Sequence, residues 1–521
     1  MIEEITVRVS PRTAAIPHEL LKTVAKQLKL PESEIHDIRI LRRSIDARQK
    51  NIKINLKLSV ASGNDQQAVQ QIKFKEFKKV DKGAPSIVIV GAGPSGLFAA
   101  LKAIELNIRP VIIERGEDVE KRRFKLASIS RQGKLDSETN YCFGEGGAGA
   151  YSDGKLFTRS TKRGNVTEIL QLLHQFGASE DILIDSHAHI GSDKLPGIIK
   201  NIRNTIIEKG GEVRFNEKMT DLIIEDGECK GIITGEGNEI RGAVILATGH
   251  SAKDVYRMLD RKNIKIEAKG LAMGVRVEHP QSLIDKILYH SPEGRGEFLP
   301  PAEYRFKERV DDRAVYSFCM CPGGVIVPSM SAEEESLVNG MSASARSGKW
   351  ANSALVVEIL PEDIKDDGSG ELRILNLQQK LEKDFFLASG KTLKAPAQRL
   401  TDFLNGKESE NLPASSYPAG LVSQRVDSLL PQFISSRLKE GIRRIDGKYS
   451  GFLTKDSTVV GLESRTSSPV RIPRDPVTLE HVEIKNLYPA GEGAGYAGGI
   501  VSSALDGQNA VVSFNKSLRT G

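Results

Sequence analysis

The sequence has no long apolar stretch and little cysteine. No run of about 18 apolar residues occurs in the 521-residue chain, so no membrane span is predicted. The first residues, MIEEITVRVSPR, include early acids and no apolar core, which differs from the pattern of a signal peptide. Four cysteines, at positions 142, 229, 319 and 321, are too few for a disulfide scaffold. These absences predict a cytoplasmic protein.

Acidic residues are scarce in the first part of the chain only. Lys and Arg outnumber Asp and Glu by 17 to 10 in residues 1–82, whereas the remainder has 57 against 58. A half-exposed sheet, on which basic and apolar residues alternate, accounts for this excess. The alternative is an anionic partner such as RNA. Phe74 and Phe77 lie beside lysines, but the segment has no recognised RNA-binding signature.

Residues 1–82 read as a small α/β domain. EITVRV alternates Ile5, Val7 and Val9 with polar residues, which predicts a half-buried strand. Residues 17–30 place leucines and Val24 on one helical face. Two further strands are expected within residues 35–58. IKFKEFKKVDKGAP, at residues 72–85, is expected to form a last strand and a linker.

A glycine-rich turn follows the linker. VIVGAGPSGLFAA, at residues 88–100, holds a G-x-G-x-x-G motif between an apolar strand and an apolar helix. The glycines permit a tight turn, close approach of a pyrophosphate and close packing of the helix, whose N-terminus attracts phosphates. An acid that ends the next strand is placed to accept hydrogen bonds from ribose hydroxyls. The turn therefore predicts a dinucleotide site at Gly91, Gly93, Pro94, Ser95, Gly96, Glu114 and Arg115.

Three later segments indicate which dinucleotide is bound. A loop with many glycines, CFGEGGAGAYSDGKL, suits close approach of the backbone to a bulky planar ligand. The strand ending ILATGH and the tail LYPAGEGAGYAGGI carry further glycines, and the tail leads into a helix. That helix N-terminus suits the pyrimidine edge of a flavin, where reduction leaves negative charge. We expect FAD contacts at Gly144, Gly146, Gly147, Gly149, Thr248, Gly249, Gly491, Glu492, Gly493, Gly498, Gly499 and Ile500.

The chain resembles FAD-dependent oxidoreductases of the glutathione-reductase-like superfamily in the turn, in ILATGH and in LYPAGEGAGYAGG. More narrowly, it resembles a bacterial family of uncharacterised FAD-dependent dehydrogenases, also described as NAD(P)/FAD-dependent oxidoreductases. That second resemblance rests on RRSIDARQKNI, NYCFGEGGAGAYSDGKL, FCMCPGG and AGEGAGYAGGI, and spans nearly the whole chain. Glu492 stands where the superfamily often has Asp, and its longer side chain is expected to contact the cofactor differently. The resemblance implies FAD but no particular substrate.

The expected fold is α/β. It comprises a discontinuous Rossmann-like FAD-binding domain with a parallel sheet, an inserted mixed α+β substrate domain and the small N-terminal α/β domain. The boundaries are 1–82, 83–255 and 461–521 for the N-terminal and FAD-binding parts, and 256–460 for the insertion. The middle of the chain has no second G-x-G-x-x-G after a strand. A separate NAD(P) domain is therefore not expected, and any NAD(P)H binds transiently.

Candidate catalytic residues lie in the middle of the chain. Cys319 and Cys321, in FCMCPGG, would face the same side of a strand, for redox chemistry or for packing. A C-x-C pair without a second ligand pair is a poor metal site, so no metal is predicted. His279 is a candidate proton donor or a buried structural histidine, and His250 is placed near the adenosine. Arg465 and Ser467 are candidate flavin contacts, whereas Arg276, Arg346 and Arg399 join Arg465 as candidate clamps for an acidic substrate.

The favoured function is hydride transfer between FAD and a small organic substrate, by an FAD-dependent oxidoreductase. Three alternatives stay open: a flavoprotein that acts on RNA through its basic N-terminal domain, a non-catalytic flavin-binding protein, and thiol chemistry at Cys319 and Cys321. The substrate, the electron donor and the oligomeric state are not given by the sequence.

Overall fold

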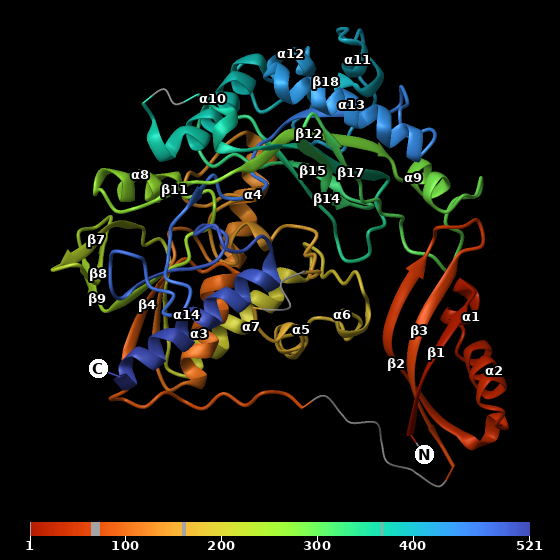
Figure 1. Ribbon diagram of the computed structural model, residues 1–521, viewed down its shortest axis with the longest axis horizontal. Helices are drawn as coiled ribbons and strands as arrows, with labels where there is room; N and C mark the ends of the chain where they lie inside the picture. Colours follow the sequence, from red (N-terminus) through yellow and green to blue (C-terminus); the bar gives the residue numbers. More distant parts are fainter. Residues whose placement is uncertain (1, 64–72, 159–162, 366–367, 521) are drawn as a thin grey trace.

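The computed structural model describes residues 2–63, 73–158, 163–365 and 368–520. It is a mixed α/β structure (Figure 1). No helix in these ranges is long and apolar enough to cross a membrane.

An antiparallel sheet in the order β1-β3-β2 forms the N-terminal unit, which lies at the right of Figure 1. Its apolar residues alternate as expected, since Ile5, Val7 and Val9 are buried and pack with Leu20 and Val24 of α2. The elements of this unit are β1 (Ile2–Val9), α1 (Pro11–Ala15), α2 (Pro17–Leu28), β2 (Ile35–Asp46) and β3 (Lys53–Ser62).

The N-terminal unit contacts the rest of the chain through ion pairs. Arg43 of β2 pairs with Asp185 at 2.6 Å, and Arg39 pairs with Glu180 at 3.0 Å. Part of the basic excess of residues 1–82 is therefore opposed by acids around the short helix α6 (Asp181–Ile184).

The strand expected within residues 72–85 is absent from the described part of that segment. Residues 73–81 form no strand and run along the lower edge of Figure 1. Their backbone is held by helices instead: the N–H of Lys75 donates to the Gln175 side chain at 2.8 Å, and the N–H of Val80 donates to the Lys209 carbonyl at 2.9 Å. The alternation of polar and apolar residues in this segment arises because one side of an extended chain is exposed to solvent, and not because the segment is paired in a sheet.

A parallel sheet in the order β22-β10-β4-β5-β6 forms the centre of the larger body. β22 comes from near the C-terminus, yet it pairs with β10 in register, Leu487 opposite Val244. The strands are β4 (Ser86–Val90), β5 (Arg109–Ile113), β6 (Glu212–Arg214), β10 (Ala243–Leu246) and β22 (Leu487–Pro489).

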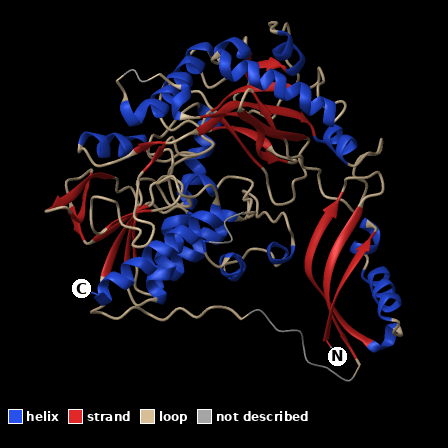
Figure 2. Cartoon of the chain, viewed as in Figure 1, coloured by secondary structure: helices blue, strands red, loops and turns tan. Residues whose placement is uncertain are grey.

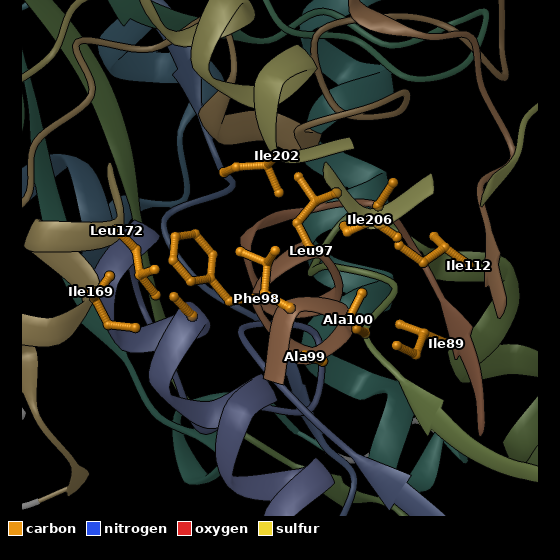
Figure 3. Close-up of a cluster of buried hydrophobic side chains, with 14 of the residues drawn as sticks. Ile89, Leu97, Phe98, Ala99, Ala100, Ile112, Ile169, Leu172, Ile202 and Ile206 are labelled. Atoms are coloured by element: carbon orange, nitrogen blue, oxygen red, sulfur yellow. The ribbon is translucent and has the colours of Figure 1, made fainter. Parts of the chain in front are cut away.

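Helices cover one face of this sheet. Figure 3 shows the core they make with it, in which Ile89 and Ile112 of the strands meet Leu97, Ile202 and Ile206 of the helices. The helices of this region are α3 (Pro94–Glu105), α4 (Val119–Gln132), α5 (Val166–Gln175), α7 (Leu195–Glu208) and α14 (Ile500–Thr520).

The other face packs against α8 and a small antiparallel sheet. Val88, Val111 and Val244 of the parallel strands meet Tyr256 and Leu259 of α8. The elements here are α8 (Lys253–Arg261), β7 (Met219–Glu225), β8 (Glu228–Thr234), β9 (Glu239–Arg241), β11 (Glu267–Ala268) and β21 (Val470–Arg471).

A second large sheet, mostly antiparallel, has the order β13-β14-β17-β12-β20-β18-β19. Helices cover its outer face (Figure 2). Its inner face has the small buried residues Ala272, Ala354 and Val356, against which Tyr316 and Phe318 pack. The strands are β12 (Leu271–Pro280), β13 (Lys307–Val310), β14 (Arg313–Cys321), β17 (Trp350–Ile359), β18 (Ala395–Arg399), β19 (Leu421–Ser423) and β20 (Thr458–Glu463).

The remaining elements surround this sheet. They are a hairpin and five helices of the described ranges: β15 (Val325–Pro328), β16 (Val338–Met341), α9 (Gln281–Leu288), α10 (Arg373–Ala388), α11 (Leu400–Asn405), α12 (Val426–Leu429) and α13 (Gln432–Lys448).

Helix α3 lies directly on the turn that precedes it because Gly96 has no side chain. A β-carbon at Gly96 would lie 1.9 Å from the carbonyl oxygen of Gly91. We expect Gly96→Ala to destabilise the protein by about 1–3 kcal/mol or more, as overpacking of a tight contact does. Chemical denaturation, followed by circular dichroism, measures the difference in unfolding free energy.

Gly197→Ala is the matched control. Gly197 is exposed on α7, and a β-carbon there would have no neighbour within 4 Å. It should raise the unfolding free energy by about 0.5–1 kcal/mol, because alanine loses less backbone entropy in a helix. Equal effects of the two substitutions would contradict the packing argument.

Candidate cofactor and substrate site

A cavity of about 940 Å³ lies between the carboxyl ends of the parallel strands and the inner face of the second sheet. Its volume is in the upper range for small-molecule sites. The structure brings most of the sequence-predicted residues to its lining: Gly91, Gly93, Pro94, Ser95, Glu114, Arg115, Gly144, Gly147, Gly149, Thr248, Gly249, Cys319, Arg465, Glu492, Gly498, Gly499 and Ile500.

Two helix N-termini point to this cavity. No side chain caps α3 at Gly93, and α14 begins at Ile500 directly after Gly498 and Gly499. Free backbone N–H groups and the helix dipole favour anions at such ends. Ser95, in the first turn of α3, has a buried hydroxyl without a hydrogen-bond partner among the described residues.

Glu114 is already bound to the protein backbone. Its carboxylate accepts hydrogen bonds from the N–H groups of Ala92 at 2.8 Å, Gly116 at 3.0 Å and Gly144 at 3.1 Å. The carboxylate therefore ties the nucleotide turn to the loop that contains Gly144. It still lines the cavity and has acceptor capacity left for a ribose hydroxyl.

Arg115 is paired with acids. Its guanidinium contacts Glu138 at 2.5 Å and Asp254 at 3.1 Å, and it lies over the ring of Phe143 at 3.9 Å. The side chain therefore builds the wall of the cavity rather than offering an unpaired charge.

The loop at residues 144–149 is held from behind by arginines that sequence reasoning missed. Fully buried Arg122 donates to the carbonyls of Glu145 and Gly147, each at 2.8 Å. Arg203 pairs with Glu145 at 2.9 Å, and burial raises the pKa of Glu145 to about 7. Gly146 lies outside the cavity, against Ile199. An arginine in an ordinary helical pattern gives no sequence signal for this role.

The predicted cofactor contacts in the C-terminal segment divide into two groups. Glu492, Gly498 and Gly499 line the cavity, and His250 approaches Glu492 at 3.4 Å. Gly491 and Gly493 lie behind the lining. The N–H of Gly491 donates to Asp506 at 2.7 Å, and the carbonyl of Gly493 accepts from the Tyr256 hydroxyl at 2.8 Å.

The donor set and shape fit a dinucleotide. A β-carbon at Gly249, Gly498 or Gly499 would meet no protein atom within 4 Å, so these positions form an open cradle. Ser95 and Ser251 also line the cavity, but their hydroxyl oxygens are buried, and that of Ser95 lies against Gly491 and Gly507. The fit to a dinucleotide therefore depends on the glycines and the helix N-termini.

Cys319 and Cys321 lie in an irregular part of β14 and differ in their access to the cavity. The pairing of β14 with β17 shifts between Phe318 and Cys321, and Cys319 has a left-handed backbone at φ +48°. Cys319 therefore lines the cavity, whereas Cys321 is buried and donates to the Cys319 carbonyl at 3.3 Å. Both thiols are free. Burial raises both pKa values, that of Cys321 to about 11, which disfavours the nucleophilic thiolate.

His279 lies away from the cavity lining. It is fully buried in β12, and one ring nitrogen, Nε2, lies 2.8 Å from the Phe452 carbonyl. Burial lowers its pKa to about 4, so the ring is neutral at physiological pH. These contacts favour the interpretation of His279 as a buried structural histidine over that of a proton donor.

The arginines proposed as substrate clamps have partners within the protein. Arg276 pairs with Glu463 at 2.9 Å, and Arg346 forms a two-pronged pair with Asp153. Arg399 donates to the carbonyl of Lys455 and to Asn411. Ser467 lies outside the cavity lining, 3.4 Å from the ammonium of Lys269. Sequence reasoning could not see these partners because they come from distant segments.

Arg465 lines the cavity as one member of a buried group of four charges. It pairs with Glu335 at 2.7 Å and with Glu382 at 2.9 Å, and Lys253 pairs with both acids. Although burial favours the neutral acid, Arg465 and Lys253 lower the pKa of Glu335 to about 2. One N–H of Arg465 also contacts the sulfur of Cys142 at 3.4 Å.

Lys155 is a cavity residue that sequence reasoning missed. Its ammonium donates to Asp153 at 2.8 Å and to the carbonyl of Met320. Asp153 in turn accepts from Arg346. In the described residues, no group of three or more His, Cys, Asp or Glu side chains is arranged to hold a metal ion.

Removing Arg465 should destabilise the protein strongly. Arg465→Met leaves Glu335 and Glu382 facing one cation, and breaking a buried pair in this way costs about 3–5 kcal/mol. Arg241→Met is the control, because Arg241 is exposed and its pairs with Glu225 and Glu239 lie in solvent. Thermal unfolding should show a large loss for the first variant and no measurable change for the second.

Comparisons with known proteins support a flavin site. Residues 270–466 match a family model described as FAD-dependent protein, C-terminal domain-like, and residues 1–61 match a domain of unknown function. A protein of Clostridium beijerinckii described as uncharacterized is 41% identical over 505 residues, which cover 94% of each chain. The chain belongs to the same family as the Clostridium beijerinckii protein. The cofactor of the chain is FAD.

Two solved structures resemble the chain at low identity and low TM-score. A geranylgeranyl bacteriochlorophyll reductase-like protein from Thermoplasma acidophilum has a TM-score of 0.35 and 12% identity, covering 84% of this chain and 80% of its own. The flavin-dependent brominase Bmp2 has a TM-score of 0.37 and 12% identity, with coverage of 84% and 79%.

Proposed function

We propose that this FAD-dependent protein is an oxidoreductase of the glutathione-reductase-like superfamily that transfers hydride between FAD and a small organic substrate. The observation that carries the proposal is the composition of the cavity. One wall is made of nucleotide-binding elements, and the opposite wall is a sheet face with Tyr316 and Phe318. A cavity of about 940 Å³ with two chemically different walls suits a cofactor and a second ligand together.

The nucleotide wall offers each part of FAD a suitable group. Gly93 and the N-terminus of α3 suit the pyrophosphate, and Glu114 suits the adenosine ribose. Gly498, Gly499 and the N-terminus of α14 suit the flavin end, where an anionic reduced ring gains from the helix dipole. When bound, FAD accepts or gives the hydride, while the protein residues hold it and exclude water.

The chain is proposed to divide into four segments: an N-terminal domain at 1–82, an FAD-binding domain at 83–255 and 461–521, and an inserted substrate domain at 256–460. Pairing of β22 with β10 and packing of α14 on α3 support a discontinuous FAD-binding domain. The matched family model at residues 270–466 falls largely within the insertion.

Gly93→Ala should remove FAD without unfolding the protein. Gly93 has φ −77°, which alanine adopts, and its β-carbon would have only Gly147 nearby, at 3.9 Å. The added methyl would instead occupy the space proposed for the pyrophosphate, so FAD affinity should fall about tenfold or more. Thermal unfolding of the apoprotein and titration with FAD, followed by flavin fluorescence, separate the two effects.

An unchanged FAD affinity in Gly93→Ala would contradict the proposed position of the pyrophosphate. Gly237→Ala is a control for added bulk, since Gly237 lies in a surface turn with no neighbour within 4 Å and outside the cavity. Its positive φ of 83° predicts some loss of stability but no loss of FAD.

Anaerobic addition of NADPH and then NADH tests the reaction class. If a nicotinamide cofactor is the electron donor, its hydride passes to FAD, and the oxidised-flavin absorption bleaches while NADP⁺ or NAD⁺ forms. If the flavin stays oxidised with NADPH and with NADH but is bleached by an organic substrate, that substrate is the hydride donor. A flavin that no donor reduces would refute the oxidoreductase proposal.

A further inference from the structure

One end of the cavity has no nucleotide-binding glycines. We name it the substrate lobe and define it by Phe157, Arg305, Lys307, Tyr316 and Phe318, all of which line the cavity. These residues come from the loop after Gly154, from the segment that leads into β13, and from β14.

The floor of the substrate lobe is a pair of aromatic rings. Tyr316 and Phe318 alternate along β14, so both side chains project from the same face of the sheet. They rest on the small buried residues Ala272, Ala354 and Val356 and are themselves only half-buried. Their free ring faces suit a flat, apolar part of a ligand, because aromatic rings favour offset stacking.

The wall of the lobe carries the guanidinium of Arg305, which is exposed to solvent. The ring of Phe157, which is 48% exposed, stacks on His187 with 9° between the planes. The guanidinium carbon of Arg305 lies 4.8 Å from the centre of the Phe157 ring, and one of its nitrogens lies 3.0 Å from His187. The same His187 nitrogen, Nδ1, also lies 2.9 Å from Glu303 and cannot bond to both side chains at once. At most one of the five N–H donors of Arg305 is therefore used here, and the others can bind a ligand.

The basic side chains of this wall, Arg305 and Lys307, are exposed to solvent. Within the described ranges, no carboxylate lies within 4 Å of the charged nitrogens of Arg305 or Lys307. Of the acids that line the lobe, Glu303 contacts His187 at 2.9 Å, whereas Glu358 accepts a hydrogen bond from the Ala314 N–H at 3.2 Å and forms no ion pair among the described residues. An uncommitted guanidinium beside an aromatic floor selects an anion attached to a flat ring.

From these contacts we propose that the substrate lobe binds a planar aromatic compound with a carboxylate or phosphate group. Its ring would lie on Tyr316 and Phe318, and its anion would contact Arg305 and Lys307. The proposal rests on the proposed function, in which the lobe receives the second ligand. The same chemistry is found in two sources, an aromatic acid substrate and the phosphates of a nicotinamide dinucleotide, which the experiment distinguishes.

Equilibrium dialysis of the full-length protein with saturating FAD tests the charge requirement. The probes are 2-naphthoate, its neutral counterpart 2-naphthamide, and NADP⁺. Loss of a hydrogen-bonded ion pair is worth about tenfold or more in affinity. We expect either 2-naphthoate to bind about tenfold more tightly than 2-naphthamide, or NADP⁺ to bind with the same dependence on Arg305.

Substitutions assign the anion contact. Arg305→Met should weaken binding of the anionic probe about tenfold, and Lys307→Met should weaken it less, because lysine is a flexible point charge. Arg309→Met is the matched control, since Arg309 lies in β13 four residues after Arg305, pairs with Asp312 and lies outside the cavity lining. Phe318→Leu should weaken 2-naphthoate and 2-naphthamide equally, which tests the aromatic floor separately.

The outcomes are distinct. An effect of Arg305→Met on 2-naphthoate alone assigns the lobe to an aromatic acid, and an effect on NADP⁺ alone assigns it to a nucleotide phosphate. The proposal is overturned if charged and neutral probes bind equally, if Arg305→Met behaves like Arg309→Met, or if no probe binds below about 10 mM. FAD content is measured on the same samples, so a failure to bind FAD counts against the proposed function and not against the anion preference.

Discussion

The close contact between helices α3 and α14 is the constraint on which the site depends. A β-carbon at Gly507 of α14 would lie 2.0 Å from the carbonyl oxygen of Ser95 in α3. This approach places the N-termini of two helices beside the same cavity, although α3 ends at Glu105 and α14 begins only at Ile500. The parallel sheet alone would offer only one of them. Anion-binding capacity is thereby concentrated at one place, as a dinucleotide requires.

Buried charges hold the two large sheets together around the cavity. Lys253 comes from α8 beside the parallel sheet, Glu382 comes from α10, and Arg465 follows β20 of the second sheet. Such a group gains little net free energy, because each ion must lose its water. Its geometry is nevertheless strict, since any displacement leaves a charge unpaired. The group therefore fixes the relative position of the walls rather than adding much stability.

Local features were predictable from the sequence, and contacts between distant segments were not. The nucleotide turn, the strands on either side of it and the alternation of β1 depend on residues close in the chain, so pattern and spacing predicted them. The positions of Cys319 and Cys321 depend on a register shift against β17, and the role of Arg122 depends on carbonyls of a loop that follows it. Residues 73–81 show the same limit, because an alternating pattern does not reveal whether a neighbouring strand exists.

The distance in sequence between the cavity walls has a consequence for synthesis. Residues 93–95 and 498–503 both line the cavity, and β22 covers the edge of β10. While the ribosome still holds α14, β10 has an open edge and α3 an uncovered apolar face, both of which favour association with other chains. Between synthesis of β10 and emergence of α14, the nascent protein therefore exposes two surfaces that favour aggregation.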